Sequence, residues 1–481
     1  MGLFAALFAI LLMARLCHTD ILWADEDYHQ AAAIQLLHGK VLYRDLWYDK
    51  PPLNAAAYLL FGAAGGGVLR TASAIYALLV CWSAYCFAKN VWSEREGRIA
   101  AALAAFGLIF YFPPATITLE PDTLLILPHF WAVYFAWRKR YFVAGTIAGL
   151  AMLLNVKALF VLAACAPLEW TPLGMLLLGF LIPNAAGALL LAGLGAAAGY
   201  LDQVWGWGWL YVNMPASSET APAMLFTHPL LLLTRLMPLA NWSGFHAALI
   251  VGAFWCCWKE PETRLRWIGW TLICFGGVMI GWRFPPRYMN QLLPPLTLAA
   301  SRGFALAFSE KRRILQALLV AALLIPAIRF GPRYAMLAAE SLRGMPHNWI
   351  DTAMDRDSRA AAAIVSRLAS PGATLVVWGY RPNIYVYTRL AAGSRYWDSQ
   401  PLTGVPASRH LFDDRPVAMD WAAENRAEFA RSRPDFLADG LSLYNPRLDI
   451  HRYPDLRQWL SQYCEVGRSA DTIVYRRCGN P

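Results

Sequence analysis

Eleven apolar stretches, each near the roughly 20 residues that a bilayer core demands, fill the first 330 residues of this 481-residue chain. Hydrophobic residues make up 58% of the chain and Asp, Glu, Lys and Arg only 15%, against about 25% charged residues in soluble domains. This composition excludes an ordinary soluble protein and predicts a polytopic α-helical membrane protein. The expected spans are 2–17, 68–88, 98–113, 122–137, 141–156, 158–168, 172–195, 242–258, 267–282, 289–308 and 314–330.

The tail of the chain differs from the apolar part. Residues 331–481 carry 19 of the 42 Lys and Arg residues and 16 of the 32 Asp and Glu residues, in less than a third of the length. An amphipathic stretch at 351–368 precedes short apolar runs at 374–378, 434–438 and 472–475. Strands alternating with helices indicate a small α/β domain. We therefore expect a membrane domain at 1–330 and a C-terminal α/β domain at 331–481.

Basic residues set the expected topology. Four short loops between spans hold clusters of them, and loops rich in Lys and Arg face the cytoplasm. The clusters are Lys89/Arg95/Arg98, Arg138/Lys139/Arg140, Lys259/Arg264/Arg266 and Arg302/Lys311/Arg312/Arg313. The parity of eleven spans then places the first loop, 18–67, and the whole tail outside a plasma or inner membrane. Because topology accounts for most of the net charge of +10, we expect no nucleic-acid partner.

Two of the nine cysteines lie in the tail, at Cys464 and Cys478, on either side of its last apolar run. Thiols in an outward-facing domain meet oxidising conditions, where disulfides form and persist. We consider a disulfide between these two residues, with paired and free thiols both open at this stage.

The first outer loop is rich in charged residues. It contains the acidic run Asp25-Glu26-Asp27 and later the run Asp49-Lys50-Pro51-Pro52. Two consecutive prolines hold a short backbone rigid. These features favour a built site over a merely solvated loop.

Further ionisable residues stand at the outer ends of other spans. They are Glu120 and Asp122, Lys157, and Arg283 with Arg287. Charges at membrane depth are costly unless they face a polar cavity or a partner. Ion pairs that fix helix packing remain one explanation. The other is a cavity for a lipid phosphate, in which cations hold the phosphate and a carboxylate accepts a proton from an acceptor hydroxyl.

The motifs Asp25-Glu26, Gly39, Tyr43 and Asp49-Lys50-Pro51-Pro52-Leu53, followed by Glu120-Pro-Asp122, Asn155-Val-Lys157 and Arg287-Tyr288, resemble the GT-C superfamily. Its members are membrane glycosyltransferases that use polyprenyl-phosphate sugars. The chain is most similar to the branch that includes dolichyl-phosphate-mannose-protein mannosyltransferases and lipid A aminoarabinose transferases. The resemblance covers nearly the whole chain and implies an inverting transfer at the outer face of the membrane.

The resemblance implies roles for individual residues. Asp25 matches the family's catalytic base, with Glu26 beside it, and Lys50 matches the lysine near the donor phosphate. Asp49 stands where the aminoarabinose branch often has Glu, so its side chain is one methylene shorter. Further donor-phosphate contacts are expected at Lys157, Arg283, Arg287 and Tyr288. Acceptor binding, sugar binding or structural support is expected of Asp27, Tyr43, Glu120 and Asp122.

Cofactors and acceptors stay open at this stage. Asp25 and Asp27 could together hold Mg²⁺ or Mn²⁺, which carboxylates suit. The acceptor could be a lipid, a glycan or a protein, and membrane lipids are further expected partners. A transporter of a polar or anionic substrate is the main alternative, because intramembrane charges also mark transport pathways. Transporters commonly show paired repeats, and this sequence shows none.

Overall fold

The computed structural model describes all residues except 1, 168, 214–228, 346–347 and 480–481. The chain folds into two compact units. A helical unit comprises Met1–Thr19, Gly66–Gly187 and Pro215–Pro346, and a sheet unit comprises Asp20–Gly65, Ala188–Met214 and His347–Pro481. Part of the predicted outer segment 196–241 lies outside the described residues.

Each of the eleven predicted apolar stretches contains a helix. The helices are α1 (Gly2–Leu16), α4 (Gly66–Val91), α5 (Glu94–Gly107), α8 (Ile126–Trp137), α9 (Tyr141–Met152), α10 (Ala158–Ala164), α11 (Trp170–Gly193), α16 (Ala247–Lys259), α17 (Pro261–Met279), α18 (Leu293–Ser309) and α19 (Arg313–Leu342). Within the described part of the chain, α4, α11 and α19 are long and apolar enough to cross a membrane by length and composition. Eleven spans, and their orientation, stay predictions.

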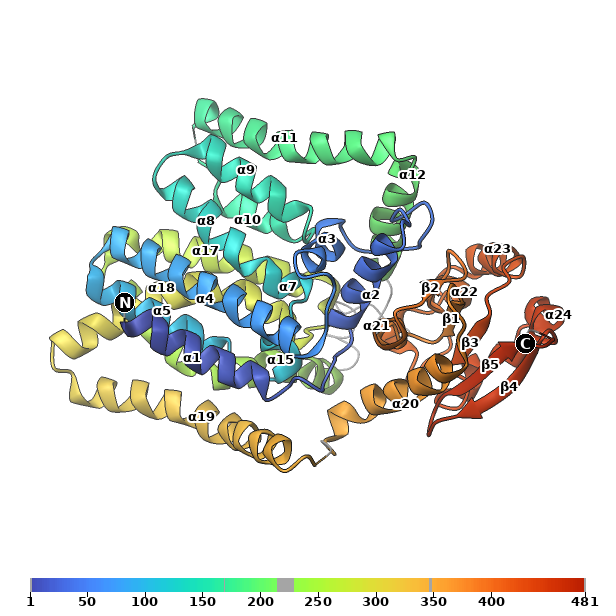
Figure 1. The fold of residues 1–481 in the computed structure, drawn as a ribbon. Helices are drawn as coiled ribbons and strands as arrows, with labels where there is room; N and C mark the ends of the chain where they lie inside the picture. Colours follow the sequence, from blue (N-terminus) through green and yellow to red (C-terminus); the bar gives the residue numbers. More distant parts are fainter. Residues whose placement is uncertain (1, 168, 214–228, 346–347, 480–481) are drawn as a thin grey trace. The chain divides into compact units, whose positions relative to one another are not determined.

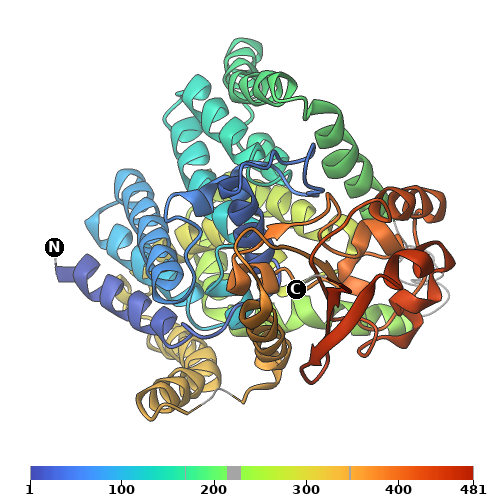
Figure 2. The same cartoon turned by 45° about the vertical axis from the view of Figure 1, so that its right-hand side comes forward.

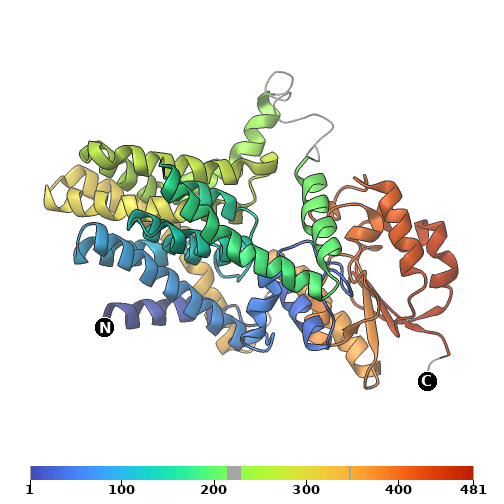
Figure 3. The same ribbon diagram turned by 90° about the horizontal axis from the view of Figure 1, so that it is seen from above.

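Close backbone approaches hold the helical unit together. Helices α1, α4, α5 and α18 lie side by side (Figures 1 and 3), and α18 is buried along most of its length. A Cβ atom at Gly303 of α18 would lie 1.8 Å from the backbone oxygen of Gly252 on α16, so only glycine fits. Small residues at such contacts are typical of helices that pack in membranes.

Short elements at the helix ends position the charged residues of this unit. They are α6 (Pro113–Thr116), α7 (Pro121–Leu124) and the 3-10 helices η2 (Ile280–Trp282) and η3 (Pro286–Leu292).

One longer helix of this unit, α15 (Pro229–Phe245), was not predicted from the sequence.

The sheet unit contains a five-stranded mixed sheet in the order β2-β1-β3-β5-β4. Strand β1 (Thr374–Trp378) is parallel to β2 (Ala391–Ala392) and β3 (Phe436–Asp439), while β5 (Ile473–Arg477) is antiparallel to β3 and β4 (Tyr463–Arg468). The tail therefore contains a small sheet, as expected from its short apolar runs.

Helices complete the sheet unit (Figure 2, where residues 347–481 are orange to red). Helix α20 (Ala353–Leu368) packs against β4, β5 and α21 (Asn383–Thr388). The other helices of the tail are α22 (Gln400–Thr403), α23 (Met419–Phe429), α24 (Arg457–Leu460) and the 3-10 helices η4 (Ile350–Thr352), η5 (Ala407–Arg409), η6 (Pro446–Leu448), η7 (Ile450–Arg452) and η8 (Pro454–Leu456). Residues 188–214 add α12 (Ala197–Tyr200), the π-helix η1 (Leu201–Gly206) and α13 (Trp207–Asn213).

The compact units differ from the predicted division at residue 330. Helix α19 continues to Leu342, and the first loop, with α2 (Glu26–Leu37) and α3 (Leu53–Leu59), belongs to the sheet unit. The reason is specific pairing. The buried Gln35 amide donates to the Leu390 carbonyl at 3.1 Å and accepts from the Ala392 amide at 2.7 Å, on β2. Hydropathy along the sequence does not reveal such a contact.

Candidate active site

The acidic run of the first loop forms the start of α2. Asp25 has a positive φ of 73°, which is uncommon for a residue other than glycine. It occupies the N-cap position, yet its side chain makes no capping hydrogen bond. Glu26 and Asp27 follow in the first helical turn and are buried, whereas Asp25 is only partly buried. Of the three acids, Asp25 is therefore the one best placed to meet a substrate.

Asp49 and Lys50 form an ion pair, with 2.7 Å between Oδ2 of Asp49 and Nζ of Lys50. The Asp49 side chain is 8% exposed and the Lys50 side chain 34% exposed. Burial alone would lower the pKa of Lys50, but the Asp49 carboxylate outweighs it and the pKa of Lys50 is raised. Tyr43 donates its hydroxyl to the Lys50 carbonyl at 2.7 Å. Tyr43 thus positions Lys50, which remains charged and reachable.

The tail contributes two residues that sequence reasoning missed. Tyr380 lies two residues after β1 and interacts electrostatically with Asp25, Asp27 and Asp49. Asp398 interacts with Asp49 and Lys50, and burial followed by the Asp49 charge raises the pKa of Asp398 to about 8. We call the set Asp25, Asp27, Asp49, Lys50, Tyr380 and Asp398 the acidic cluster.

Three oxygen atoms of the acidic cluster are buried without a hydrogen-bond partner among the described residues. They are Oδ1 of Asp27, Oδ1 of Asp49 and Oδ2 of Asp398. Burial, with the nearby Asp25 charge, also raises the pKa of Asp27 well above its usual range. Buried polar atoms are nearly always paired, so three orphans in one place indicate a site built to receive donors.

The helical unit contains a second set of charged residues. Nζ of Lys157 lies 2.7 Å from Oδ1 of Asp122 and 3.0 Å from the centre of the Tyr288 ring. Asn155 donates to the same Asp122 oxygen at 3.1 Å. Both charged side chains are nearly buried, at 8% and 6% exposed. The four residues come from η3, α7 and the segment between α9 and α10, which they tie together.

Glu120 caps α7 within this set. Its carboxylate accepts from the amides of Asp122 and Thr123 and from the Thr123 hydroxyl, at 2.8 to 2.9 Å. Arg287 interacts electrostatically with both Glu120 and Lys157. Arg283 follows η2 and is partly exposed. We call Glu120, Asp122, Asn155, Lys157, Arg287 and Tyr288 the paired cluster.

Asp25 and Asp27 lack the further ligands that a metal site needs. Over the described ranges no group of three or more His, Cys, Asp or Glu side chains is arranged to hold an ion. Asp27 is moreover buried with a raised pKa, which opposes the ionised form that a divalent ion needs.

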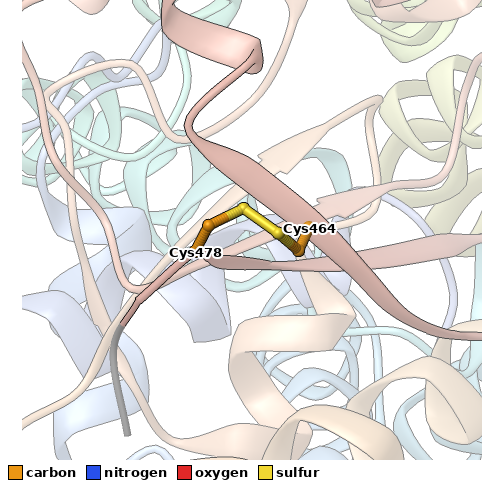
Figure 4. Close-up of a disulfide and its surroundings, with 2 residues drawn as sticks. All are labelled: Cys464 and Cys478. Atoms are coloured by element: carbon orange, nitrogen blue, oxygen red, sulfur yellow. A yellow bond between two sulfur atoms is a disulfide. The ribbon is translucent and has the colours of Figure 1, made fainter.

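The tail contains the disulfide considered from the sequence. It joins Cys464 on β4 to Cys478 just after β5, with a Cα–Cα distance of 5.3 Å (Figure 4). The bond links the ends of two adjacent antiparallel strands at one edge of the sheet.

The chain is similar to one protein family and to several solved structures. Residues 49–200 match the family described as dolichyl-phosphate-mannose-protein mannosyltransferase. No curated protein sequence matches the chain. The structure of ArnT from Cupriavidus metallidurans bound to undecaprenyl phosphate superposes with a TM-score of 0.59 at 13% identity, covering 100% of this chain and 98% of that one.

A second solved structure shares the fold. It is the archaeal oligosaccharyltransferase AglB from Archaeoglobus fulgidus, in complex with an inhibitory peptide and a dolichol-phosphate. Its TM-score is 0.50 at 13% identity, and the match covers 99% of this chain and 74% of that one. At such identities the likeness is one of fold.

Proposed function

The chain has the fold of the GT-C membrane glycosyltransferases, as its motifs predicted, and from this premise we propose that it transfers a sugar from a polyprenyl-phosphate donor. The acceptor would be a hydroxyl or phosphate, the reaction site would face the outside of the membrane, and the anomeric configuration would invert. The observation that carries the proposal is the partly buried Asp25 next to the Asp49–Lys50 ion pair within one compact unit.

In the proposed reaction the acceptor oxygen attacks the anomeric carbon while the bond from that carbon to the phosphate oxygen breaks. Asp25 takes the acceptor proton as general base. The polyprenyl phosphate leaves as an anion, so no general acid is required, and Lys50 stabilises the developing charge. A single displacement of this kind inverts the anomeric centre. Asp49 holds the Lys50 ammonium in place.

Other residues keep the roles that the family resemblance implies, as proposals. Donor-phosphate contact is proposed for Arg283, Arg287 and Tyr288, and for Lys157 in so far as its pairing with Asp122 allows. Glu26, which is fully buried, is proposed to support Asp25 rather than to act as the base. The family match and ArnT, whose structure holds undecaprenyl phosphate, support a lipid-phosphate donor.

The experiment measures release of polyprenyl phosphate by purified protein in lipid nanodiscs. We expect turnover of a polyprenyl-phosphate monosaccharide and none of the matching nucleotide sugar. Asp25→Asn should reduce turnover by about 10²-fold or more, because an amide cannot accept the proton. Its unfolding temperature should stay close to that of the parent protein.

Asp45→Asn is the matched control from the same loop. Asp45 pairs with Arg44 at 2.8 Å near the surface, and its loss should leave turnover within about 3-fold, since surface ion pairs contribute little. Efficient use of the nucleotide sugar alone would refute the proposal. Unchanged turnover in Asp25→Asn would instead move the base to Asp49 or Glu26.

A further inference from the structure

The sheet topology places Tyr380 and Asp398 at a position where α/β folds bind ligands. The chain leaves β1 on one side to form β2 and returns on the other side to form β3. The carboxyl ends of β1 and β3 are thus adjacent, and the Gly440 amide donates to the Trp378 carbonyl at 2.8 Å. In open parallel sheets, ligands bind in the crevice beyond such ends, where the strand order reverses.

Backbone contacts place both residues beyond these strand ends. Tyr380 follows Gly379, whose φ of 127° is strained for any other residue and where a Cβ would lie 3.3 Å from the Gly440 backbone. The Ser399 amide, directly after Asp398, donates to the Gly379 carbonyl at 3.3 Å. The loop after β1 and the segment around Asp398 are therefore joined.

Tyr380 ends a stack of aromatic rings. The Tyr28 ring stacks on those of Tyr48, Trp397 and Tyr380, with ring centroids 5.2, 5.0 and 5.4 Å apart. Tyr28, Tyr48 and Trp397 are buried, while Tyr380 remains partly exposed. A partly exposed ring held rigidly by a buried stack offers an apolar, electron-rich face beside a polar edge. The C–H face of a pyranose ring fits such a surface.

The unpartnered oxygens define what the ligand must supply. Oδ1 of Asp27, Oδ1 of Asp49 and Oδ2 of Asp398 are buried acceptors with no donor in the described part of the chain. Asp27 and Asp398 are only 3% and 1% exposed. Hydroxyl groups both donate and accept, so they satisfy these oxygens whether the carboxyl groups are ionised or protonated, whereas a phosphate brings mainly further acceptors.

The charges of the acidic cluster also argue against an anionic ligand. Lys50 is already paired with Asp49, and Asp25 adds another carboxyl group next to Tyr380. Burial raises the pKa of Asp27 and of Asp398, which reduces the negative charge without supplying a cation. An anionic acceptor would therefore meet the Asp25 carboxylate as like charge beside Tyr380.

We propose that Tyr380, Asp398 and Asp27 form the acceptor subsite and that it takes a neutral or amino sugar ring, in preference to a phosphate-bearing acceptor. The proposal rests on the glycosyltransferase function and narrows its substrate class. Tyr380 packs against the ring, and the two aspartates accept hydrogen bonds from its hydroxyl or amino groups. The acceptor is then a glycan or a glycolipid headgroup.

The first test measures binding without turnover, by saturation-transfer NMR on the full-length protein in nanodiscs. The probes are methyl mannoside, methyl glucoside and methyl glucosaminide, together with mannose 6-phosphate, glucose 6-phosphate and N-acetylthreonine amide. We expect transfer to the three glycosides and at least 10-fold weaker binding of the phosphates and the amide. Equal or stronger binding of either phosphate, or of the amide, would overturn the proposal.

Variants assign the binding to the subsite. Tyr380→Leu and Asp398→Asn should each weaken glycoside binding by about 10-fold, while Tyr380→Phe, which keeps the ring, should lose less. Asp413→Asn is the control, since Asp413 is a buried aspartate of the same unit whose carboxylate is paired with Arg415 at 2.9 Å. If Tyr380→Leu fails to fold, Asp398→Asn and Tyr380→Phe decide the matter. Unchanged glycoside binding in Asp398→Asn would count against the subsite.

A second test separates this proposal from the function on which it rests. With a methyl glycoside as surrogate acceptor, Tyr380→Leu should raise the KM for the glycoside by about 10-fold and leave the KM for the lipid donor within about 3-fold. A raised donor KM alone would place Tyr380 on the donor and refute the acceptor assignment. Donor cleavage with phosphate-bearing acceptors only would refute the subsite and keep the function. Glycoside binding without any donor cleavage would refute the function.

Discussion

The two charged clusters of this protein have similar residues and opposite hydrogen-bonding states. In the paired cluster, the Asp122 carboxylate accepts hydrogen bonds from Lys157 and Asn155. The Glu120 carboxylate accepts hydrogen bonds from two backbone amides and a hydroxyl. In the acidic cluster, one carboxyl oxygen each of Asp27, Asp49 and Asp398 has no donor among the described residues. A satisfied buried network specifies structure, while an unsatisfied one carries a cost that a ligand can remove.

The contrast between the clusters argues against the predicted contact of Lys157 with the donor phosphate. Its ammonium contacts Asp122 and the face of Tyr288, and so it already has a partner that a donor phosphate would have to displace. Lys50 is also paired, but its side chain is about four times as exposed as that of Lys157. The comparison favours Lys50 as the phosphate ligand and Lys157 as a residue that holds helix ends together.

The largest expected effect tests this structural role. Lys157→Met should destabilise the helical unit by about 3–5 kcal/mol, because it leaves the Asp122 carboxylate buried and unpaired. The double variant Lys157→Met/Asp122→Leu should recover most of that loss, since no lone charge remains. Denaturant unfolding in nanodiscs measures both. The control is Lys259→Met, which breaks a half-exposed pair with Glu310 and should cost about 1 kcal/mol or less.

One outcome would show that the two clusters do not differ in function. If Lys157→Met kept full stability and lost binding of polyprenyl phosphate, Lys157 would be a phosphate ligand like Lys50. The paired cluster would then be part of the substrate site.

The disulfide gives the next effect and is confined to the sheet unit. Cys464 and Cys478 are 14 residues apart, and closing a loop of that size stabilises a fold by about 3 kcal/mol in the chain-entropy model. Replacing both cysteines by serine should destabilise the sheet unit by up to that amount and leave the helical unit unchanged. Hydrogen exchange followed by mass spectrometry resolves the two units.

The same pair also checks the predicted outward orientation of the tail. Disulfides persist in oxidising compartments and are rare in the cytosol. Alkylation of intact cells before lysis should therefore find Cys464 and Cys478 oxidised. Free thiols at both positions in freshly quenched cells would contradict an outward-facing sheet unit.

The existence of the helices could be predicted from the sequence, but not their lengths or grouping. Each apolar stretch does contain a helix, because long apolar runs have few other stable solutions in a membrane. Helix α15 was missed because Arg235 and Pro238 interrupt its apolar run, and α19 continues through Pro332 past its predicted end. The joining of the first loop to the tail depends on contacts such as Gln35 with Ala392. Contacts between residues so distant in sequence leave no local signal.

The charged sites were predicted unequally for a related reason. The sequence indicated that Asp122, Lys157 and Tyr288 belong to charged positions at outer helix ends, but it assigned them to different roles and did not predict that Lys157 would contact both of the others. Tyr380 and Asp398 belong to no motif of charged residues and lie more than 300 positions from Asp25. One usable signal existed for Tyr380, which follows the predicted strand 374–378 and a glycine. Asp398 had none.

The last expected effect is the pH dependence that the acidic cluster imposes on the sheet unit. Asp398 has a pKa of about 8 in the folded protein, whereas a carboxyl group in an unfolded chain has a pKa of about 3.9. Between these values the folded state binds the additional proton, so stability falls as pH rises from about 4 to 8, by at most about 1.4 kcal/mol per pH unit. Asp27 acts in the same direction.

Asp398→Asn should therefore flatten the fall in stability between pH 5 and 8, since an amide does not titrate. The control has the opposite sign, because the hydrogen bond from Arg415 lowers the pKa of Asp413 to about 2. Asp413→Asn should therefore lose a stabilisation that is constant between pH 5 and 8 and that disappears from the parent protein as the pH falls below about 4. Unfolding of the sheet unit from pH 3 to 8, followed by hydrogen exchange, measures both. A pH profile in Asp398→Asn that matches the parent protein would mean that Asp398 is ionised in the folded state. Its charge must then have a partner, and the acidic cluster would be as fully paired as the one around Lys157.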